Sequence, residues 1–275
     1  MGLHVTFRGV RGTVPCPTRE HIGYGGNTSC VQVAAGDRTI ILDAGTGIRA
    51  VGQDLLSRGV NEATLLLTHV HHDHINGLPF FAPVFQPNWR GRVLCGNIEH
   101  YKGGIKQALT KYMEAPLFPV PLPTMPAELE FVDFRAGESF DLDGGITVRT
   151  ALLNHPDGAT GYRVEHGGAS LAYVTDTEHV PGRPDENVLR LIEGCDLVIY
   201  DCAYTEEEFP ARIGWGHSTW TEGIRLCRAA GAKRLALFHH DPSHDDVRMA
   251  AIEADAKVMW TDSFAAREGM TVTLG

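Results

Sequence analysis

A short apolar segment that ends in a cluster of histidines constrains this chain more than any other feature. Residues 63–67, Ala-Thr-Leu-Leu-Leu, have the pattern of a buried strand. Candidate metal ligands follow at once: His69, His71, Asp73 and His74. An extended turn aims the first two imidazoles one way, and the bend after them aims the carboxylate and the last imidazole at a second point. One ion does not need this split arrangement, whereas two neighbouring ions do, so the segment predicts a pair of metal ions.

Other strand-like segments carry residues of the same kinds, which a solvated histidine-rich loop would not require. Before the histidine cluster stands 38–47 with Asp43-Ala44-Gly45, and after it stand 152–155 ending at His155 and followed by 161–164, 171–177 with Asp176, and 235–239 ending at His239. Together with the pattern HxHxDH, these segments in their order resemble the metallo-β-lactamase superfamily. The resemblance implies an α/β fold, the four-layer αβ/βα sandwich, with the metals at one edge between two sheets. It also implies that Asp43 supports the metal loop without being a ligand.

The resemblance assigns the metal ligands to two sites. They are His69, His71 and His155 in the first site, Asp73, His74 and His239 in the second, and Asp176 as a bridge between both ions. Two ions roughly 3.5–4 Å apart can clamp the attacking and leaving oxygens of a displacement and lower the pKa of bound water towards roughly 7. A metal-bridging hydroxide is then the expected nucleophile. Two Zn2+ ions suit so many imidazoles, with Mn2+ or Fe as alternatives.

The last ligand has two candidates. His239 and His240 are adjacent, so a shift of one residue in the strand before them would exchange their places. We favour His239 because it follows the strand directly.

A second motif, Gly214-Trp215-Gly216-His217-Ser218-Thr219, precedes a helix expected over 219–230. It resembles the phosphodiesterase branch of the superfamily, which includes ribonuclease Z and small cyclic-phosphate and cyclic-nucleotide phosphodiesterases. The resemblance places this turn beside the metals, where His217 could protonate a leaving alkoxide or bind a phosphoryl oxygen. Such acid catalysis is worth about 10²–10⁴-fold. Ser218 and the first amides of the helix could add an anion site. In the alternative interpretation His217 only packs at the helix start. Asp73 and His217 are our candidate catalytic residues.

The amino-terminal loop contains Gly9-Val10-Arg11-Gly12 and then Gly25-Gly26-Asn27-Thr28. In the branch that this chain resembles, the loop faces the active site. Asn27 and Thr28 could therefore donate hydrogen bonds to a substrate. They could equally serve as turn residues, because Gly-Gly-Asn is a strong turn signal.

Residues 79–126 are rich in proline and aromatic side chains, including Phe80, Phe85 and Trp89. We expect an insertion here, and two interpretations stay open. The segment could be a rigid connection packed on the core, or an apolar lid or homodimer surface beside the metals. It lacks the long basic arm with which ribonuclease Z holds transfer RNA.

Composition agrees with one soluble enzyme domain over residues 1–275. The chain has 43% hydrophobic and 21% charged residues, and its net charge is −10. Basic side chains form only weak clusters, such as Arg8 with Arg11, so a small anionic substrate is favoured and a long nucleic acid is not. No apolar run is long enough to span a membrane, the amino terminus does not suggest a signal peptide, and the cysteines have no CxxC spacing. We expect a cytoplasmic protein.

The periodicity of apolar residues predicts alternating strands and helices. Strands are expected near 3–10, 29–35, 38–43, 64–68, 92–95, 129–134, 145–153, 161–165, 170–175, 196–201, 234–238 and 270–274. Helices are expected over 47–57, 103–113, 186–193, 219–230 and 244–255. Ser218 or Thr219 can cap the helix at 219–230, with Glu222 completing a capping box.

Four functions compete on this evidence. A phosphodiesterase acting on a small nucleotide or cyclic phosphate is favoured by His217 and Asp176. An acyl hydrolase of the lactonase type would share the metals but would not need His217. A flavin-linked reductase would need an attached domain for which this chain has no room. A non-catalytic metal-binding protein would be expected to lose ligands, yet the full set is present.

Overall fold

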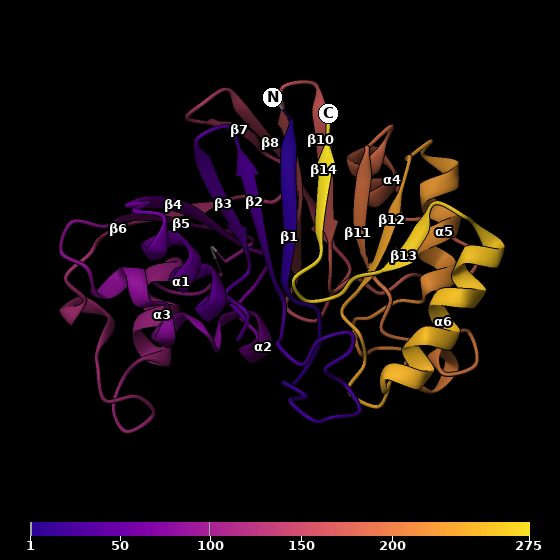
Figure 1. Ribbon diagram of the computed structural model, residues 1–275, viewed down its shortest axis with the longest axis horizontal. Coiled ribbons are helices and arrows are strands. Elements are labelled where there is room, and N and C mark those ends of the chain that lie inside the picture. The colour runs from indigo at the N-terminus through magenta and orange to yellow at the C-terminus, as the bar shows by residue number, and fades with distance from the viewer. Residues whose placement is uncertain (1, 99) are drawn as a thin grey trace.

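A computed structural model describes residues 2–98 and 100–275, which form two seven-stranded sheets (Figure 1). The first sheet has the strand order β14-β1-β2-β3-β4-β5-β6. Its strands are β1 (Leu3–Gly9), β2 (Cys30–Ala35), β3 (Arg38–Leu42), β4 (Glu62–Leu67), β5 (Arg90–Gly96), β6 (Glu128–Phe134) and β14 (Thr271–Leu274). The second sheet has the order β13-β12-β11-β10-β9-β8-β7. Its strands are β7 (Ser139–Leu142), β8 (Ile146–Leu153), β9 (Ala159–His166), β10 (Ala169–Val174), β11 (Leu197–Asp201), β12 (Leu235–Phe238) and β13 (Ser263–Ala265).

Helices cover the outer faces of both sheets. They are α1 (Ile48–Ser57), α2 (His72–Ile75), α3 (Gly104–Tyr112), α4 (Glu186–Ile192), α5 (Trp220–Ala229) and α6 (Asp246–Met259), with short 3₁₀ turns at Leu78–Phe80, Ala82–Phe85, Leu122–Thr124 and Phe209–Ala211. Figure 1 shows α1 and α3 beside the first sheet and α4, α5 and α6 beside the second. The termini lie together, because β1 pairs antiparallel with β14. Among the described residues, no helix is long and apolar enough to cross a membrane.

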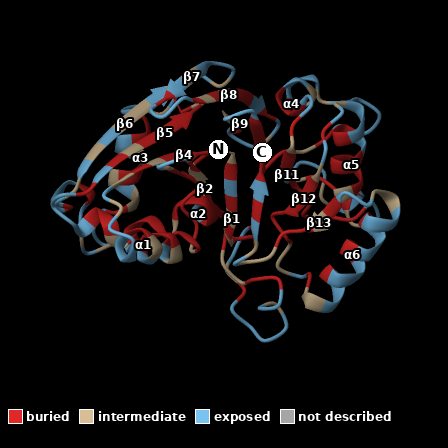
Figure 2. Ribbon diagram, turned by 45° about the horizontal axis from the view of Figure 1, so that its top comes forward, coloured by how far each residue is buried: buried red, intermediate tan, exposed pale blue. Residues whose placement is uncertain are grey.

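The three largest apolar cores of the described residues hold these layers together. The central core joins the inner faces of the sheets and includes Val33, Tyr173 and Phe238. The second core lies under α4, α5 and α6, and the third lies under α1 and α3. Figure 2 shows the buried residues concentrated between the layers and the exposed ones on the outward helix faces. The expected αβ/βα sandwich is thus confirmed, since each sheet buries one face against the other sheet and one against helices.

Local signals explain the helix starts. Thr219 is the N-cap of α5, and its hydroxyl accepts a hydrogen bond from the backbone N–H of Glu222, as expected for a capping box. Asp185 caps α4 and Asp245 caps α6 in the same way. The expected elements are all present with shifted ends. The short edge strands β7 and β13 were missed, because few apolar residues mark them.

The segment 79–126 differs from the expected insertion. Strand β5 lies inside it and pairs in parallel with both β4 and β6, so its middle belongs to the first sheet. Phe81 and Trp89 are buried in the core under α1 and α3, whereas Phe80 is 60% exposed. Only residues 97–126 therefore remain candidates for a lid. A homodimer formed through this segment stays a prediction.

Candidate metal centre

The carboxyl ends of several strands meet at one edge of the two sheets. Strands β3 and β4 are parallel to each other, as are β10, β11 and β12. Strand β8 is antiparallel to β9, and β9 is antiparallel to β10, so β8 ends at the same edge. This geometry brings together side chains from six strand ends that are far apart in the sequence.

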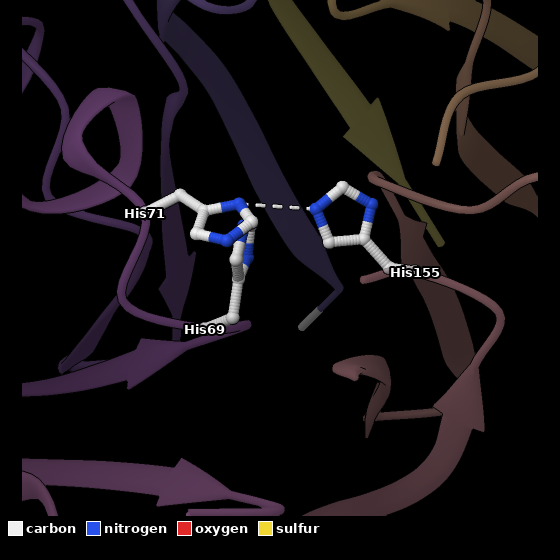
Figure 3. Close-up of side chains that lie close together, drawn as sticks. All are labelled: His69, His71 and His155. Atoms are coloured by element: carbon white, nitrogen blue, oxygen red, sulfur yellow. Dashed lines mark hydrogen bonds between the residues drawn. The ribbon is translucent and has the colours of Figure 1, made fainter. Parts of the chain in front are cut away.

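Among the described residues, four groups of side chains have ligand atoms within 4.8 Å of one another at this edge, and the two that include His217 overlap the other two through His155, Asp176 and His239. The other two groups contain the ligand candidates. These two groups are His69, His71 and His155, and Asp73, His74, Asp176 and His239. They match the two sites expected from the sequence. Figure 3 shows His69 and His71 on one side and His155 on the other, with the dashed line joining His71 Nδ1 to His155 Nε2 at 3.1 Å.

The second group has spacings that suit one cation. His74 Nε2 lies 3.3 Å from Asp73 Oδ2 and 3.1 Å from Asp176 Oδ2. His239 Nε2 lies 3.3 Å from Asp73 Oδ2 and 3.4 Å from Asp176 Oδ2. A tetrahedral zinc ion with bonds of about 2.0–2.1 Å separates its ligand atoms by about 3.3 Å. The four separations therefore suit ligand atoms around one cation.

The carboxylate of Asp176 lies between the two groups. Its Oδ1 is 3.9 Å from both His69 Nε2 and His155 Nε2, while Oδ2 faces His74 and His239. Thr175 holds this side chain by donating a hydrogen bond from Oγ1 to Oδ2. Each oxygen of one carboxylate thus faces a different imidazole cluster, which is the geometry that a bridging ligand requires.

Neighbouring groups orient the imidazoles. His74 Nδ1 lies 2.8 Å from Asp43 Oδ2, and His155 Nδ1 lies 2.8 Å from the carbonyl oxygen of Gly216. Since an acceptor fixes the proton on Nδ1, the lone pair of Nε2 is left for a metal. Among the described residues, His69 Nε2 and both nitrogens of His239 have no hydrogen-bond partner, although they are buried. Buried imidazoles without partners are costly unless a ligand satisfies them, so these residues fit bound cations.

Asp43 connects the histidine loop to the second sheet. Its carboxylate accepts hydrogen bonds from the backbone N–H and the hydroxyl of Thr68 and from the hydroxyl of Tyr173. With His74 it therefore has three partner residues, and it is fully buried. The expected supporting role of Asp43 agrees with these contacts.

Positive φ angles mark the site. Asp43, Asp176 and His239 have φ values near 60°, as has Thr13, whose backbone N–H donates to Asp73 Oδ2 at 2.7 Å. Such conformations cost free energy in residues other than glycine and gather at functional sites. The chain therefore tolerates local strain where these side chains must converge.

Burial and charge set the protonation of the cluster. Burial lowers the pKa of His69 well below its usual value and also lowers the pKa of His71 and His155, which keeps them neutral as ligands must be. His74 is the exception. Burial opposes its charge, but the carboxylates of Asp176 and Asp73 raise its pKa well above the usual value. The acidic side of the cluster therefore favours a positive charge at its centre.

The structure separates the two candidates for the last ligand. His239 joins the second group, and its ring stacks on His74 at 5.6 Å and on His217 at 4.7 Å between centroids. His240 is fully buried on the other side of the chain, where its Nε2 lies 2.9 Å from the carbonyl oxygen of Ala266. The preference for His239 agrees with this placement.

His217 borders the metal centre from the second sheet. Its Nδ1 lies 2.9 Å from Asp201 Oδ2, at the end of β11, and 3.9 Å from Asp176 Oδ1. Burial opposes the charged ring, but the Asp201 carboxylate raises the pKa of His217 to about 9. No hydrogen bond from its Nε2 to a described residue is found. Sequence reasoning missed Asp201 as a partner, because nothing local relates it to His217.

A hollow of about 440 Å³ opens over the cluster, and its walls include His71, Asp73, His155, His217 and Trp215. Trp215 is 59% exposed, and the guanidinium of Arg212 lies 4.8 Å from its ring centroid. The sequence motif contained Trp215, but its spacing alone did not mark it as part of the wall. This hollow is where a substrate can reach the ligands.

The candidate substrate contacts have partners inside the protein. The backbone N–H and the side-chain amide of Asn27 donate to Glu268. Thr28 is buried and donates to Asn76, and Ser218 is buried between His179 and Tyr200. None of the three lines the hollow. In this structure these polar groups hold the loops around the centre, which favours the interpretation of Asn27 and Thr28 as turn residues, and a contact of the three with substrate stays a prediction.

Arg11 also differs from expectation. Its side chain is fully buried and donates hydrogen bonds to the backbone carbonyls of Gly25, Asp241 and His244. It therefore joins the amino-terminal loop to the segment after His239, and it is not part of a basic surface.

Comparison with known proteins decides the family. The beta-lactamase superfamily domain matches residues 38–240, which contain all the ligand candidates. The chain belongs to this superfamily. Ribonuclease Z of Haloarcula marismortui is 28% identical over 280 residues, covering 87% of this chain and 86% of that protein.

Solved structures agree on the fold of this superfamily member. The metallo-beta-lactamase fold protein YhfI from Bacillus subtilis superposes with a TM-score of 0.75 at 18% identity, covering 98% of each chain. A diphosphatase from the PhnP family superposes with a TM-score of 0.71 at 17% identity, covering 98% of this chain and 97% of that one.

Two glycines in the loop before His217 offer a matched test of the first ligand group. Both have positive φ, near 85–89°. A Cβ at Gly216 would lie 2.2 Å from His155 Nδ1, whereas a Cβ at Gly214 would meet nothing within 4 Å. Gly216→Ala should therefore displace His155 and lower metal content and turnover at least about tenfold, because small misplacements of a site are costly.

Gly214→Ala carries the same backbone strain, about 1–2 kcal/mol, without the collision. It should lower the unfolding temperature while leaving metal content close to wild type. Elemental analysis and thermal unfolding of both variants make the comparison. Equal metal loss in the two variants would show that strain in the loop, and not the His155 contact, controls the site.

Proposed function

We propose that this chain is a dinuclear metal-dependent phosphodiesterase that hydrolyses a small nucleotide or a cyclic phosphate. The ribonuclease Z relatives support a hydrolase that acts on phosphodiester bonds. The single observation that carries the proposal is the His217–Asp201 pair at 2.9 Å beside a carboxylate shared by two imidazole clusters. Hydrolysis of an ester of a poor leaving group needs both an activated water and a proton donor.

The metals would be held by the residues described above, with Asp176 between them. His69, His71 and His155 would hold one ion, and Asp73, His74 and His239 would hold the other. Bound divalent ions would supply an acidified water and neutralise the charge of the phosphoryl group. The imidazole-rich ligand set favours Zn2+, while Mn2+ and Fe share these ligand types.

His217 would hold a proton next to the leaving oxygen. Asp201 accepts from Nδ1, so the ring keeps one orientation and presents Nε2 to the hollow. Tyr204 and His239 pack against the ring, which limits its rotation. This geometry supports His217 as the general acid and Asp201 as its positioning residue. Asp73, whose carboxylate faces His74 and His239 in the second group, would act as a metal ligand in catalysis.

The charge of the protein favours a small substrate over a long nucleic acid. With a net charge of −10 and Arg11 buried, the surface offers little attraction for a long polyanion, whereas two cations in the hollow attract one phosphate. The ribonuclease Z relatives oppose this argument, because their name states that they act on RNA. A structured RNA therefore belongs among the substrates to be tested.

The proposal is tested with purified protein loaded with zinc or manganese. We expect about two ions per chain and metal-dependent hydrolysis of bis(p-nitrophenyl) phosphate and of a cyclic nucleotide, with slower cleavage of a structured RNA. A simple lactone serves as the competing substrate. Fast lactone hydrolysis without diester hydrolysis would favour the acyl hydrolase, which would share the metals but not require His217. Bound metal with no turnover would favour the non-catalytic alternative.

A further inference from the structure

A second pocket opens directly beside the first metal group. Its volume is about 450 Å³, within the range of about 300–1,000 Å³ that small-molecule sites occupy. It shares Val70, His71 and His72 with the hollow that contains His217. The two spaces are therefore neighbours on either side of His71. A phosphodiester at the metal centre could place one ester group in each.

The far wall of this pocket comes from the segment after β5 and from α3. Ile98 is buried, Tyr101, Ala108 and Tyr112 are half-buried, and Leu117 is 76% exposed. The ring of Tyr112 lies 5.9 Å from that of His72. These side chains form apolar and aromatic surfaces of the kind on which a flat ring stacks.

Polar atoms also line this pocket without partners. Within residues 2–98 and 100–275, no hydrogen bond or ion pair is found for the hydroxyls of Tyr101 and Tyr112, the ammonium of Lys111 or the carboxylate of Asp157. Lys111 Nζ only lies over the ring of Tyr101, 5.6 Å from its centroid. Asn97 and Asp157 on the near wall have positive φ values of 55° and 61°. An alkyl group would leave these polar atoms unused, whereas a flat heteroaromatic ring has both apolar faces and a polar edge.

We propose that this pocket binds the nucleobase of a nucleoside phosphodiester, a proposal that rests on the phosphodiesterase function. The nucleoside in the pocket is the one retained on phosphorus, because His217 lies in the other hollow and serves the leaving group. Water oxygen then bonds to phosphorus and releases one proton, the bond from phosphorus to the leaving oxygen breaks, and that oxygen takes the proton of His217. The proton released by water restores the protonated His217. The products are a nucleoside monophosphate and an alcohol.

Three nitrophenyl esters with the same leaving group test the pocket in the metal-loaded full chain. They are the p-nitrophenyl phosphodiesters of thymidine (through its 5′ oxygen), of methanol and of octanol. Contact between a base and aromatic side chains should give the thymidine ester at least a tenfold higher kcat/KM than the methyl ester, at about 1.4 kcal/mol per tenfold. The octyl ester should not match it. Equal values for thymidine and methyl esters, or preference for the octyl ester, would overturn the proposal.

A variant that fills the pocket supplies the second readout. Ala108→Phe, on the pocket face of α3, should remove most of the thymidine preference through KM and weaken binding of thymidine 5′-monophosphate at least about fivefold in equilibrium dialysis. The control is Ala251→Phe, at an exposed position of α6. This variant should keep the thymidine preference and the binding of thymidine 5′-monophosphate. Tyr112→Ala gives an independent test if Ala108→Phe folds poorly, with the same expected loss. A folded variant that keeps both the preference for the thymidine ester and the binding of thymidine 5′-monophosphate would overturn the proposal that this pocket binds the base.

The two proposals fail in different ways. If wild type hydrolyses the esters without preferring thymidine, the base pocket is wrong and the phosphodiesterase stands. If metal-loaded wild type hydrolyses none of them, the phosphodiesterase is wrong and the pocket proposal falls with it.

Discussion

Asp176→Ala is expected to lower metal content from about two ions per chain to one or fewer. It should reduce turnover of a phosphodiester by about 10³-fold or more. Asp176 is the side chain whose two oxygens face different imidazole clusters, so its removal would deprive both proposed ions of a ligand. Stabilisation of transition-state charge by bound metals is worth several kcal/mol, and most of it should be lost. Elemental analysis and the rate with bis(p-nitrophenyl) phosphate measure the effect.

A matched variant separates metal loss from the loss of any buried acid. Glu253 is also a buried carboxylate, but it bonds to Tyr24 and Arg267 away from the ligands. Glu253→Ala should lower stability by about 1–3 kcal/mol and keep its metal. Circular dichroism should show both variants folded. Two ions per chain in folded Asp176→Ala would remove this carboxylate from the ligand set.

His217→Ala should slow hydrolysis of a cyclic nucleotide by at least about 10²-fold while slowing a nitrophenyl diester far less. A sugar alkoxide is a poor leaving group and needs a proton, whereas nitrophenolate leaves as a stable anion. The metal content should remain at the wild-type level, because none of the seven proposed ligands is changed. Steady-state rates on both substrates and elemental analysis of the same samples make the measurement.

Asp201→Asn tests the same pair from the other side. The amide has the shape of the carboxylate but carries no charge. His217 should therefore be held less firmly in its orientation, and its pKa should fall from the raised value. Turnover of the cyclic nucleotide should again decrease much more than turnover of the nitrophenyl diester. Equal small losses on both substrates in the two variants would make His217 a packing residue at the start of α5.

The sequence indicated the ligand groups because each ligand directly follows a strand or belongs to one short turn. Alternation in an extended turn was enough to group His69 with His71, and the resemblance to the superfamily supplied His155, Asp176 and His239. Parallel strands carry their ends to one edge of a sheet, so order along the chain is converted into proximity. The resemblance to the superfamily likewise implied two sheets covered by helices.

Side chains in loops were less predictable. Asn27, Thr28 and Ser218 have the residue types of ligand-binding turns, yet Glu268, Asn76 and His179 engage their polar atoms. Their partners come from segments far away in the sequence, and no local pattern encodes which partner a loop side chain meets. The same applies to the pairing of His217 with Asp201.

The sequence by itself determined that this chain folds as two sheets with a metal-binding edge and which side chains could serve there. Only the tertiary structure decided that His239 and not His240 faces the centre. It also decided that Arg11 is buried and hydrogen-bonded to the segment after His239, and that residues of α3 line a pocket beside His71. The physical reason is that periodicity fixes which face of an element is buried, whereas the direction of a loop side chain and the shape of a cavity depend on contacts between distant segments.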